Sequence, residues 1–144
     1  MVIILVIVAV VFVCALGLHS YKQLNLRRER CMNENEYDTA VKLWAYARLV
    51  REQIYDAMRQ GKGVLEFTAI AVPNGRGYRV SLELIGTYFR VYAVPYKYNR
   101  TGRLSFVTDT TLSVRAADRA GNPATSDDPE YEGDSTEKPR PDGE

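Results

Sequence analysis

The first sixty residues constrain this chain most, because they join an apolar run to a charged segment without any proline between them. Val2 to Leu18 contains no charged or strongly polar side chain, and the stretch that follows, up to Gly61, is charged and amphipathic. Both parts favour helix, so we expect one continuous helix that is apolar at its start. A chain of this kind is anchored or assembled through its N-terminus and presents a small head.

Length and composition set the domain organisation. The chain has 144 residues, which leaves room for one domain, and its net charge of +1 gives no electrostatic reason to expect nucleic acid as a partner. We expect an apolar helix segment over 1–18, an amphipathic helix over 19–62, an antiparallel β head over 63–117 and a polar, disordered tail over 118–144. A loop tied to the head is the alternative for Ala117 to Asp128.

The apolar run has three interpretations. Its seventeen residues form a helix about 26 Å long, at the short limit for crossing a bilayer. Ala15 and Gly17 also fit a cleaved signal peptide with a cut before Leu18, although no basic residue precedes the run. A retained anchor is the third interpretation. We expect membrane or assembly contacts from Val2, Ile3, Ile4, Leu5, Val6, Ile7, Val8, Val10, Val11, Phe12, Val13, Leu16 and Leu18.

The amphipathic segment carries strong helix signals. No Gly or Pro occurs between Leu18 and Gln60, apolar residues recur three or four positions apart, and Gly61 supplies a stop. We expect the apolar stripe to pack on the head, and a coiled-coil seam fits less well because Arg51 falls on the apolar line. The helix–head packing residues predicted from this stripe are Tyr37, Val41, Trp44, Ile54 and Met58.

The apolar period changes to two after the helix, which predicts β-strands. The expected strands are Val64–Ala71, Tyr78–Ile85, Tyr88–Val94, Leu104–Thr108 and Leu112–Ala116. Short glycine-containing turns separate the first of them, as in an antiparallel meander. Such a sheet has one apolar face to bury, and the amphipathic helix is available to cover it. The expected fold class is therefore α+β, a long N-terminal helix with a membrane-embedded first part, packed on a small antiparallel sheet.

The sequence contains no catalytic set, so we expect a protein that is not an enzyme. The only histidine, His19, has no partner for a triad or a zinc site, and no phosphate-binding glycine loop is present. Cys14 and Cys31 lie about 25 Å apart on one helix and are expected to be free thiols.

An acidic loop is the one candidate metal site. Asp118, Asp127 and Asp128 lie in a short irregular segment together with Asn122. Calcium accepts flexible shells of oxygen ligands, so Ca²⁺ is the cofactor that this segment could hold. Solvated loop carboxylates are the alternative interpretation.

Several motifs resemble the C-terminal head of type IV pilin-like proteins, a family that includes the pseudopilins of type II secretion systems. They are Tyr92–Pro95, Tyr98, Thr101–Phe106, Asp109, Arg115–Asp118 and Ala124–Pro129. The N-terminal residues Met1–Ile7 are also similar to the start of the apolar helix in that family.

This resemblance implies a pilin-like fold and a structural role. The implied function is a subunit of a type IV pilus-like filament that assembles through its apolar helix with the head outward. The alternatives are a pseudopilin of a type II secretion system and a monomeric membrane-anchored extracytoplasmic binding domain. The implied partners are homo- or hetero-oligomeric pilin-like subunits, an inner-membrane assembly platform and the membrane, without nucleic acid. The implied location is the inner membrane with an external head, followed by a cell-surface or periplasmic filament.

One part of the family pattern has no counterpart here. The cleavage glycine, the basic leader before it and the glutamate that neutralises a neighbouring N-terminus are missing. We therefore expect either further residues upstream of Met1 or a shortened relative. Lys22, Arg27, Arg28 and Arg30 follow the apolar run, and by the positive-inside rule this basic cluster alone predicts a cytoplasmic head. A basic leader before the run would remove that conflict with an external head.

Overall fold

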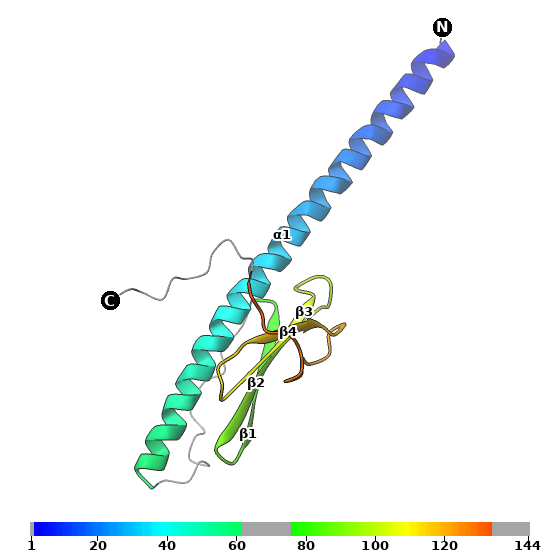
Figure 1. Ribbon diagram of the computed structural model, residues 1–144. Coiled ribbons are helices and arrows are strands. Elements are labelled where there is room, and N and C mark those ends of the chain that lie inside the picture. The colour runs from blue at the N-terminus through cyan, green and yellow to red at the C-terminus, as the bar shows by residue number, and fades with distance from the viewer. Residues whose placement is uncertain (1, 62–75, 134–144) are drawn as a thin grey trace.

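The chain consists of one long helix and one small sheet. The structure, a computed structural model, describes residues 2–61 and 76–133, with side-chain surroundings from Leu16 onward. Helix α1 spans Val2–Arg59 and ends where Gly61 adopts a φ of 66°, the left-handed conformation that glycine tolerates. The predicted continuous helix and its stop are thus confirmed, and the fold class is α+β (Figure 1).

The sheet is an antiparallel meander, as predicted. Its strands are β1 (Tyr78–Ile85), β2 (Tyr88–Pro95), β3 (Leu104–Asp109) and β4 (Arg115–Asp118), and they lie in that order across the sheet. Each pairs with its neighbour in sequence, so every connection is local. The β1–β2 turn needs only two residues because Gly86 takes a positive φ of 62°.

One expected strand begins later than predicted, and another lies outside the described residues. The strand predicted over Leu112–Ala116 begins later, at Arg115, because Leu112 has a φ of 65° and its N–H closes a turn onto the Asp109 carbonyl oxygen. A β-strand cannot contain that conformation. The strand predicted over Val64–Ala71 lies outside the described residues.

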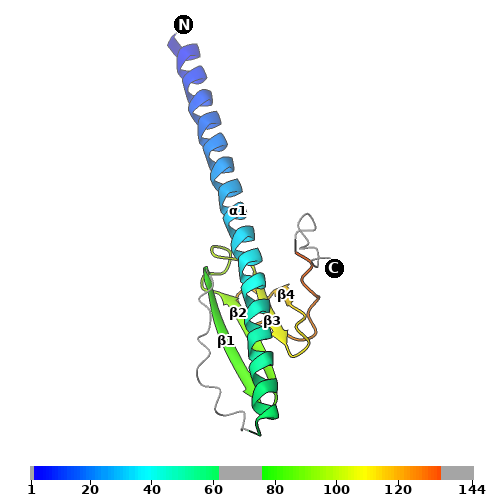
Figure 2. The same ribbon diagram turned by 90° about the vertical axis from the view of Figure 1, so that its left-hand side faces the viewer.

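The C-terminal half of α1 lies across one face of the sheet, while the N-terminal half extends beyond it (Figure 2). The alternation along β2 decides which face is covered, because Phe89, Val91 and Ala93 are fully buried. The helix residues in the same core share helical spacing, and two of them are alanines: Ala40, Leu43, Tyr46, Ala47, Val50 and Ile54. This interface is the hydrophobic core of the molecule.

The predicted packing residues are corrected by this geometry. Ile54 is buried, with 3% of its surface exposed, but Tyr37, Val41, Trp44 and Met58 are 38–52% exposed. The helix carries two neighbouring apolar stripes, and the one with the smaller side chains faces the sheet. Ala40 and Ala47 allow the helix backbone to approach the strands closely, which larger residues would prevent.

A buried carboxylate fixes the helix to the head. Glu36 is 5% exposed, and its Oε1 accepts hydrogen bonds from the backbone N–H groups of Arg103 (2.6 Å) and Leu104 (3.2 Å). The preceding residue, Asn35, donates to the Thr101 carbonyl oxygen at 3.0 Å. Arg28 donates to the carbonyl oxygen of Asn99 in the same loop. These polar contacts fix the height at which α1 meets the loop over residues 96–103.

The same loop closes tightly over a buried tyrosine. The Tyr78 hydroxyl donates to the Leu104 carbonyl oxygen at 2.9 Å, and burial, followed by the charges of Glu36 and Tyr131, raises the pKa of Tyr78 well above its ordinary value. A Cβ atom on Gly102 would lie 1.8 Å from that hydroxyl oxygen. Glycine is therefore required at position 102 for the loop to pass over the ring.

The segment predicted to be a disordered tail is partly a component of the head. Residues 118–133 are described, and in them Ala124 and Asp128 are buried. The backbone of Glu130 forms an isolated antiparallel β-bridge with Arg115, the first residue of β4. The Tyr131 ring packs edge-on against Phe106 with ring centroids 5.2 Å apart. The prediction was wrong here because local hydrogen bonds and one aromatic ring, rather than an apolar period, hold the segment. Residues 134–144 lie outside the described part.

We expect Glu36→Ala to destabilise the chain, because it leaves the N–H groups of Arg103 and Leu104 without their acceptor. The cost is about 1–3 kcal/mol for each buried donor left unsatisfied. Glu36→Gln, which keeps a carbonyl oxygen, should lose less. The measurement is urea unfolding of the full chain in a mild detergent. Glu34→Ala, at a neighbouring exposed position, is the control and should change the free energy of unfolding by less than about 0.5 kcal/mol. Equal effects at both positions would contradict this role of Glu36.

Candidate functional site

The part of α1 before the head forms a free stalk, which we define as residues 2–31. Met32 is the first buried residue among the helix side chains described from Leu16 onward, and in Figure 1 the helix extends well past the sheet on its N-terminal side. The described large apolar side chains of the stalk are more than half exposed: Leu16, Leu18, Tyr21, Leu24 and Leu26. Exposed apolar residues at this density are typical of interaction surfaces.

The expected membrane contacts fall mainly on the start of the stalk. The backbone of Val2–Val13 is helical, and the surroundings of these side chains lie outside the described residues. Leu16 and Leu18 are described, with 53% and 71% of their surfaces exposed. Within the described part of the chain, no helix meets the length and hydropathy needed to cross a membrane.

A second exposed apolar surface runs along the outside of α1 beside the head. We define the exposed stripe as Tyr37, Val41, Trp44 and Tyr55, which are 38–55% exposed. At 100° per residue, Tyr37, Trp44 and Tyr55 lie within about 20° of one line along the helix. Arg48 lies over the Trp44 ring at 5.8 Å and pairs with Glu52 at 3.0 Å, so the stripe has a polar edge. It thus resembles one half of a helix–helix interface.

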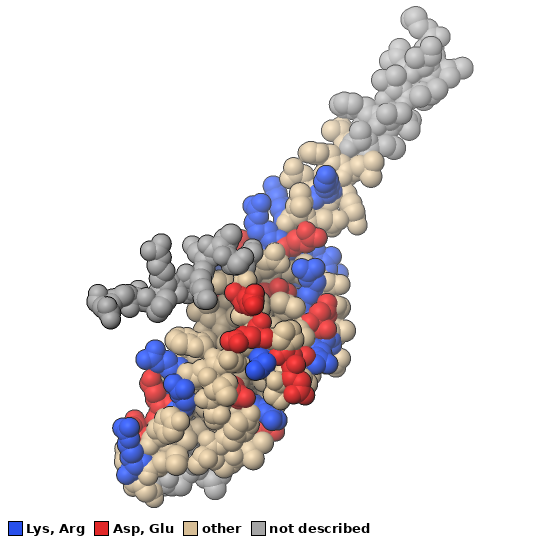
Figure 3. Space-filling view, viewed as in Figure 1, with Lys and Arg blue, Asp and Glu red and all other residues tan. Residues whose placement is uncertain are grey.

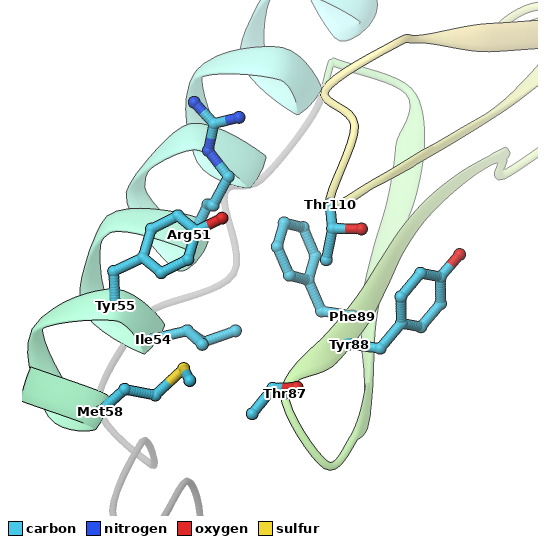
Figure 4. A pocket seen from close by; sticks show the side chains of 8 residues that line it. All are labelled: Arg51, Ile54, Tyr55, Met58, Thr87, Tyr88, Phe89 and Thr110. Atoms are coloured by element: carbon cyan, nitrogen blue, oxygen red, sulfur yellow. The ribbon is translucent and has the colours of Figure 1, made fainter. Parts of the chain in front are cut away.

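A shallow groove adjoins the lower end of this stripe. It lies between the end of α1 and the β1–β2 turn, and it has a volume of about 280 Å³ (Figure 4). Its lining combines apolar, aromatic and hydroxyl side chains with one cation: Arg51, Ile54, Tyr55, Met58, Thr87, Tyr88, Phe89 and Thr110. No carboxylate, imidazole or thiol is among these residues. The groove can accept an apolar side chain, but its lining offers no acid–base pair.

Tyrosines on the outer face of the sheet are held by carboxylates. Tyr88 donates to Asp109 at 3.0 Å, Tyr92 donates to Glu83 at 3.0 Å, and the Arg90 guanidinium lies 5.3 Å from the Tyr88 ring centre. Burial opposes ionisation of Asp109, but hydrogen bonds from Thr111 and Tyr88 outweigh it and lower the pKa of that carboxyl. The tyrosines thus belong to cross-strand pairs that stabilise the sheet.

The candidate calcium ligands have other partners. Asp118 accepts hydrogen bonds from the Tyr98 hydroxyl (3.0 Å) and the Ala120 N–H (3.1 Å), while Asp127 is exposed. Asp128 is buried and bound by the Arg119 guanidinium, which supplies the positive charge a metal ion would bring. In the ranges that the structure describes, no three acidic, histidine or cysteine side chains form a group that could hold a metal.

The Arg119–Asp128 pair closes the last loop of the head instead. Asp128 also accepts the Thr125 N–H at 2.7 Å, and its own N–H donates back to the Thr125 carbonyl oxygen at 3.2 Å. The hydrogen bond from Arg119 is the main reason that the pKa of Asp128 lies below its ordinary value. This ion pair was not predicted from the sequence, because an Arg and an Asp nine residues apart in a loop form no recognisable pattern.

The remaining reactive side chains are isolated. Cys31 is a free, exposed thiol at the top of the head, as predicted for it, and Cys14 lies outside the described side chains. His19 is exposed on the stalk.

No known family model matches the sequence, and comparisons with curated proteins and with solved structures give no match. The candidate functional surface is therefore the stalk together with the exposed stripe, judged on their geometry.

We expect Asp128→Asn to lower the melting temperature at pH 7 by several degrees, because it removes the charged acceptor for Arg119. Since the pKa of Asp128 is lowered on folding, its contribution is complete above the unfolded value of about 3.9 and is lost as the pH falls through the folded value. The gap between the two proteins should therefore shrink below about pH 4. Thermal unfolding between pH 3 and pH 7 measures it, with the exposed Asp127→Asn as control. A gap that stays constant with pH would exclude this ion pair as its cause.

Proposed function

We propose that this protein is a structural subunit of a filament of the type IV pilus kind, assembled through α1 with the β head outward. The observation that carries the proposal is the division of α1 into a packed part and a free part. Among the side chains described from Leu16 onward, those from about Met32 bury a face against the sheet, and the stalk before them exposes Leu16, Leu18 and Leu24. An apolar helix segment that no described part of its own chain covers is suited to packing against copies of itself.

The physical basis for assembly is burial of these side chains. Removing a leucine-sized side chain from water contributes about 1.5–3 kcal/mol when burial is complete. Several stalk and stripe residues together can offset the loss of translational and rotational freedom on association, which is about 4–15 kcal/mol. The apolar run Val2–Leu18 extends this surface in sequence, and it suits both a filament core and storage in the membrane before assembly.

The motifs of the head support the same proposal. The Thr101–Phe106 segment contains Gly102, which admits Tyr78, and the Arg103 and Leu104 N–H groups that bind Glu36. The residues that resemble pilin-like heads thus lie where the head joins its helix. On this proposal the location is the inner membrane with an external head and later a surface filament, and the partners are pilin-like subunits and an inner-membrane assembly platform.

Two alternatives belong to the same layout. A pseudopilin of a type II secretion system would use the stalk in the same way and build a shorter, periplasmic filament. A monomeric membrane-anchored binding domain would use the groove beside Tyr55 and Met58 and would leave Trp44 exposed. The exposed stripe favours assembly over the monomeric alternative, because a monomer gains nothing from a line of aromatic side chains on its helix.

We expect replacement of Tyr37 and Trp44 by serine to weaken self-association of the full chain without lowering its melting temperature. Both residues are substantially exposed in the single chain, so they contribute to contacts between copies and little to the core. The measurements are sedimentation velocity in a mild detergent and electron microscopy for filaments.

Leu49→Ser provides the matched control, because Leu49 is 52% exposed yet lies about 140° around the helix from Trp44. It should leave association unchanged. A wild-type chain that stays monomeric at all concentrations would contradict the filament proposal and favour the monomeric alternative.

A further inference from the structure

Charged side chains on the chain are separated along the helix axis. Residues 22–30 carry four basic side chains and one acidic side chain, whereas residues 115–132 carry five acidic and two basic ones. The first group surrounds the stalk and the second lies on the head. The described head, residues 76–133, carries eight basic and seven acidic side chains in all, so the excess of acidic side chains is local to its last segment.

We define the basic collar as Lys22, Arg27, Arg28 and Arg30, all exposed. At 100° per residue they point in directions spread around the whole helix, so at most some of them can face any one neighbour. Arg28 donates to the Asn99 carbonyl oxygen of its own head. Among the described residues, the ion pairs lie within α1 or within the loop after β4, and none joins the collar to the head.

We define the acidic face as Asp118, Asp127, Glu130 and Glu132, which are exposed. Asp118 and Glu130 accept hydrogen bonds from the neutral hydroxyls of Tyr98 and Ser113, and neither forms an ion pair among the described residues. Arg119, the nearest described cation in sequence, is bound to the buried Asp128. In Figure 3, Asp and Glu side chains lie over the head with Lys and Arg side chains between them, and further Lys and Arg side chains lie around α1 where it leaves the head.

We infer that the basic collar of one copy binds the acidic face of a second copy of this chain, an inference that rests on the proposed filament function. Two copies displaced along the helix axis place the stalk of one beside the head of the next. The apolar Leu24 and Leu26 lie between the collar cations, so the same displacement also covers exposed apolar surface. The two surfaces differ, so the contact is head-to-tail, and repetition of such a contact builds an open assembly when the rotation does not close.

The contact is electrostatic and exposed, so it sets the stagger between copies more than their total affinity. Salt of about 0.5 M should weaken it, since the Debye length is already about 8 Å at physiological ionic strength. The apolar contacts of the exposed stripe do not respond to salt in this direction.

The test is a charge swap in the full chain, in a mild nonionic detergent. The collar variant is Arg27→Glu with Arg30→Glu, and the face variant is Asp127→Lys with Glu132→Lys. Each alone should associate about tenfold more weakly, because two attractions become repulsions. An equimolar mixture of the two variants should recover association, since each then offers the surface that the other needs. Arg76→Glu with Arg79→Glu, at exposed positions near the start of β1, is the control and should have no effect.

Three results would overturn the inference. If wild-type copies associate and both variants associate equally well, the filament proposal stands and this contact is wrong. Binding of each variant to vesicles that contain phosphatidylglycerol is measured in parallel. If the collar variant loses vesicle binding while self-association of both variants is unchanged, the collar faces lipid headgroups. If the wild-type chain does not associate at all, the filament proposal fails as well.

Discussion

The structure depends on a mismatch in length between one helix and the sheet beneath it. Helix α1 has 58 residues and extends for about 87 Å, whereas the longest strands have eight residues and cover about 26 Å. A four-stranded sheet of this size can bury only the C-terminal half of such a helix. The described apolar side chains on the other half, from Leu16 to Leu26, stay exposed, and the proposed assembly would cover them.

Polar contacts determine where along its length the helix meets the head. Apolar packing between Ala47, Val50 and the strands would tolerate a shift of one turn, but the carboxylate of Glu36 can satisfy the Arg103 and Leu104 N–H groups at only one height. Gly102 adds a steric condition, because it leaves room for the Tyr78 hydroxyl. Together they define the length of the free stalk, and hence how far a neighbouring copy can reach.

Periodicity in the sequence was sufficient to predict the architecture. The long helix, its stop near Gly61 and the β1–β2 hairpin follow from proline-free helical spacing and from alternation around Gly86.

The face of the helix that packs could not be predicted, because Trp44 and Leu43 are both apolar, and the choice depends on how closely α1 approaches the strands. The role of Tyr131 was also missed, since a single ring in a polar segment carries no period. The carboxylates predicted as calcium ligands are placed by individual hydrogen bonds, which spacing alone does not encode.

The central claim is that the outer side of α1 becomes buried when copies of this chain meet. Trp44 is the only tryptophan and lies on that side, 42% exposed, so its fluorescence reports directly on the claim. The measurement is the emission spectrum and iodide quenching of the full chain across a dilution series that spans its association. Emission should shift to shorter wavelength and quenching should fall as the oligomers form. A spectrum and quenching constant that stay unchanged from monomer to oligomer would contradict the claim.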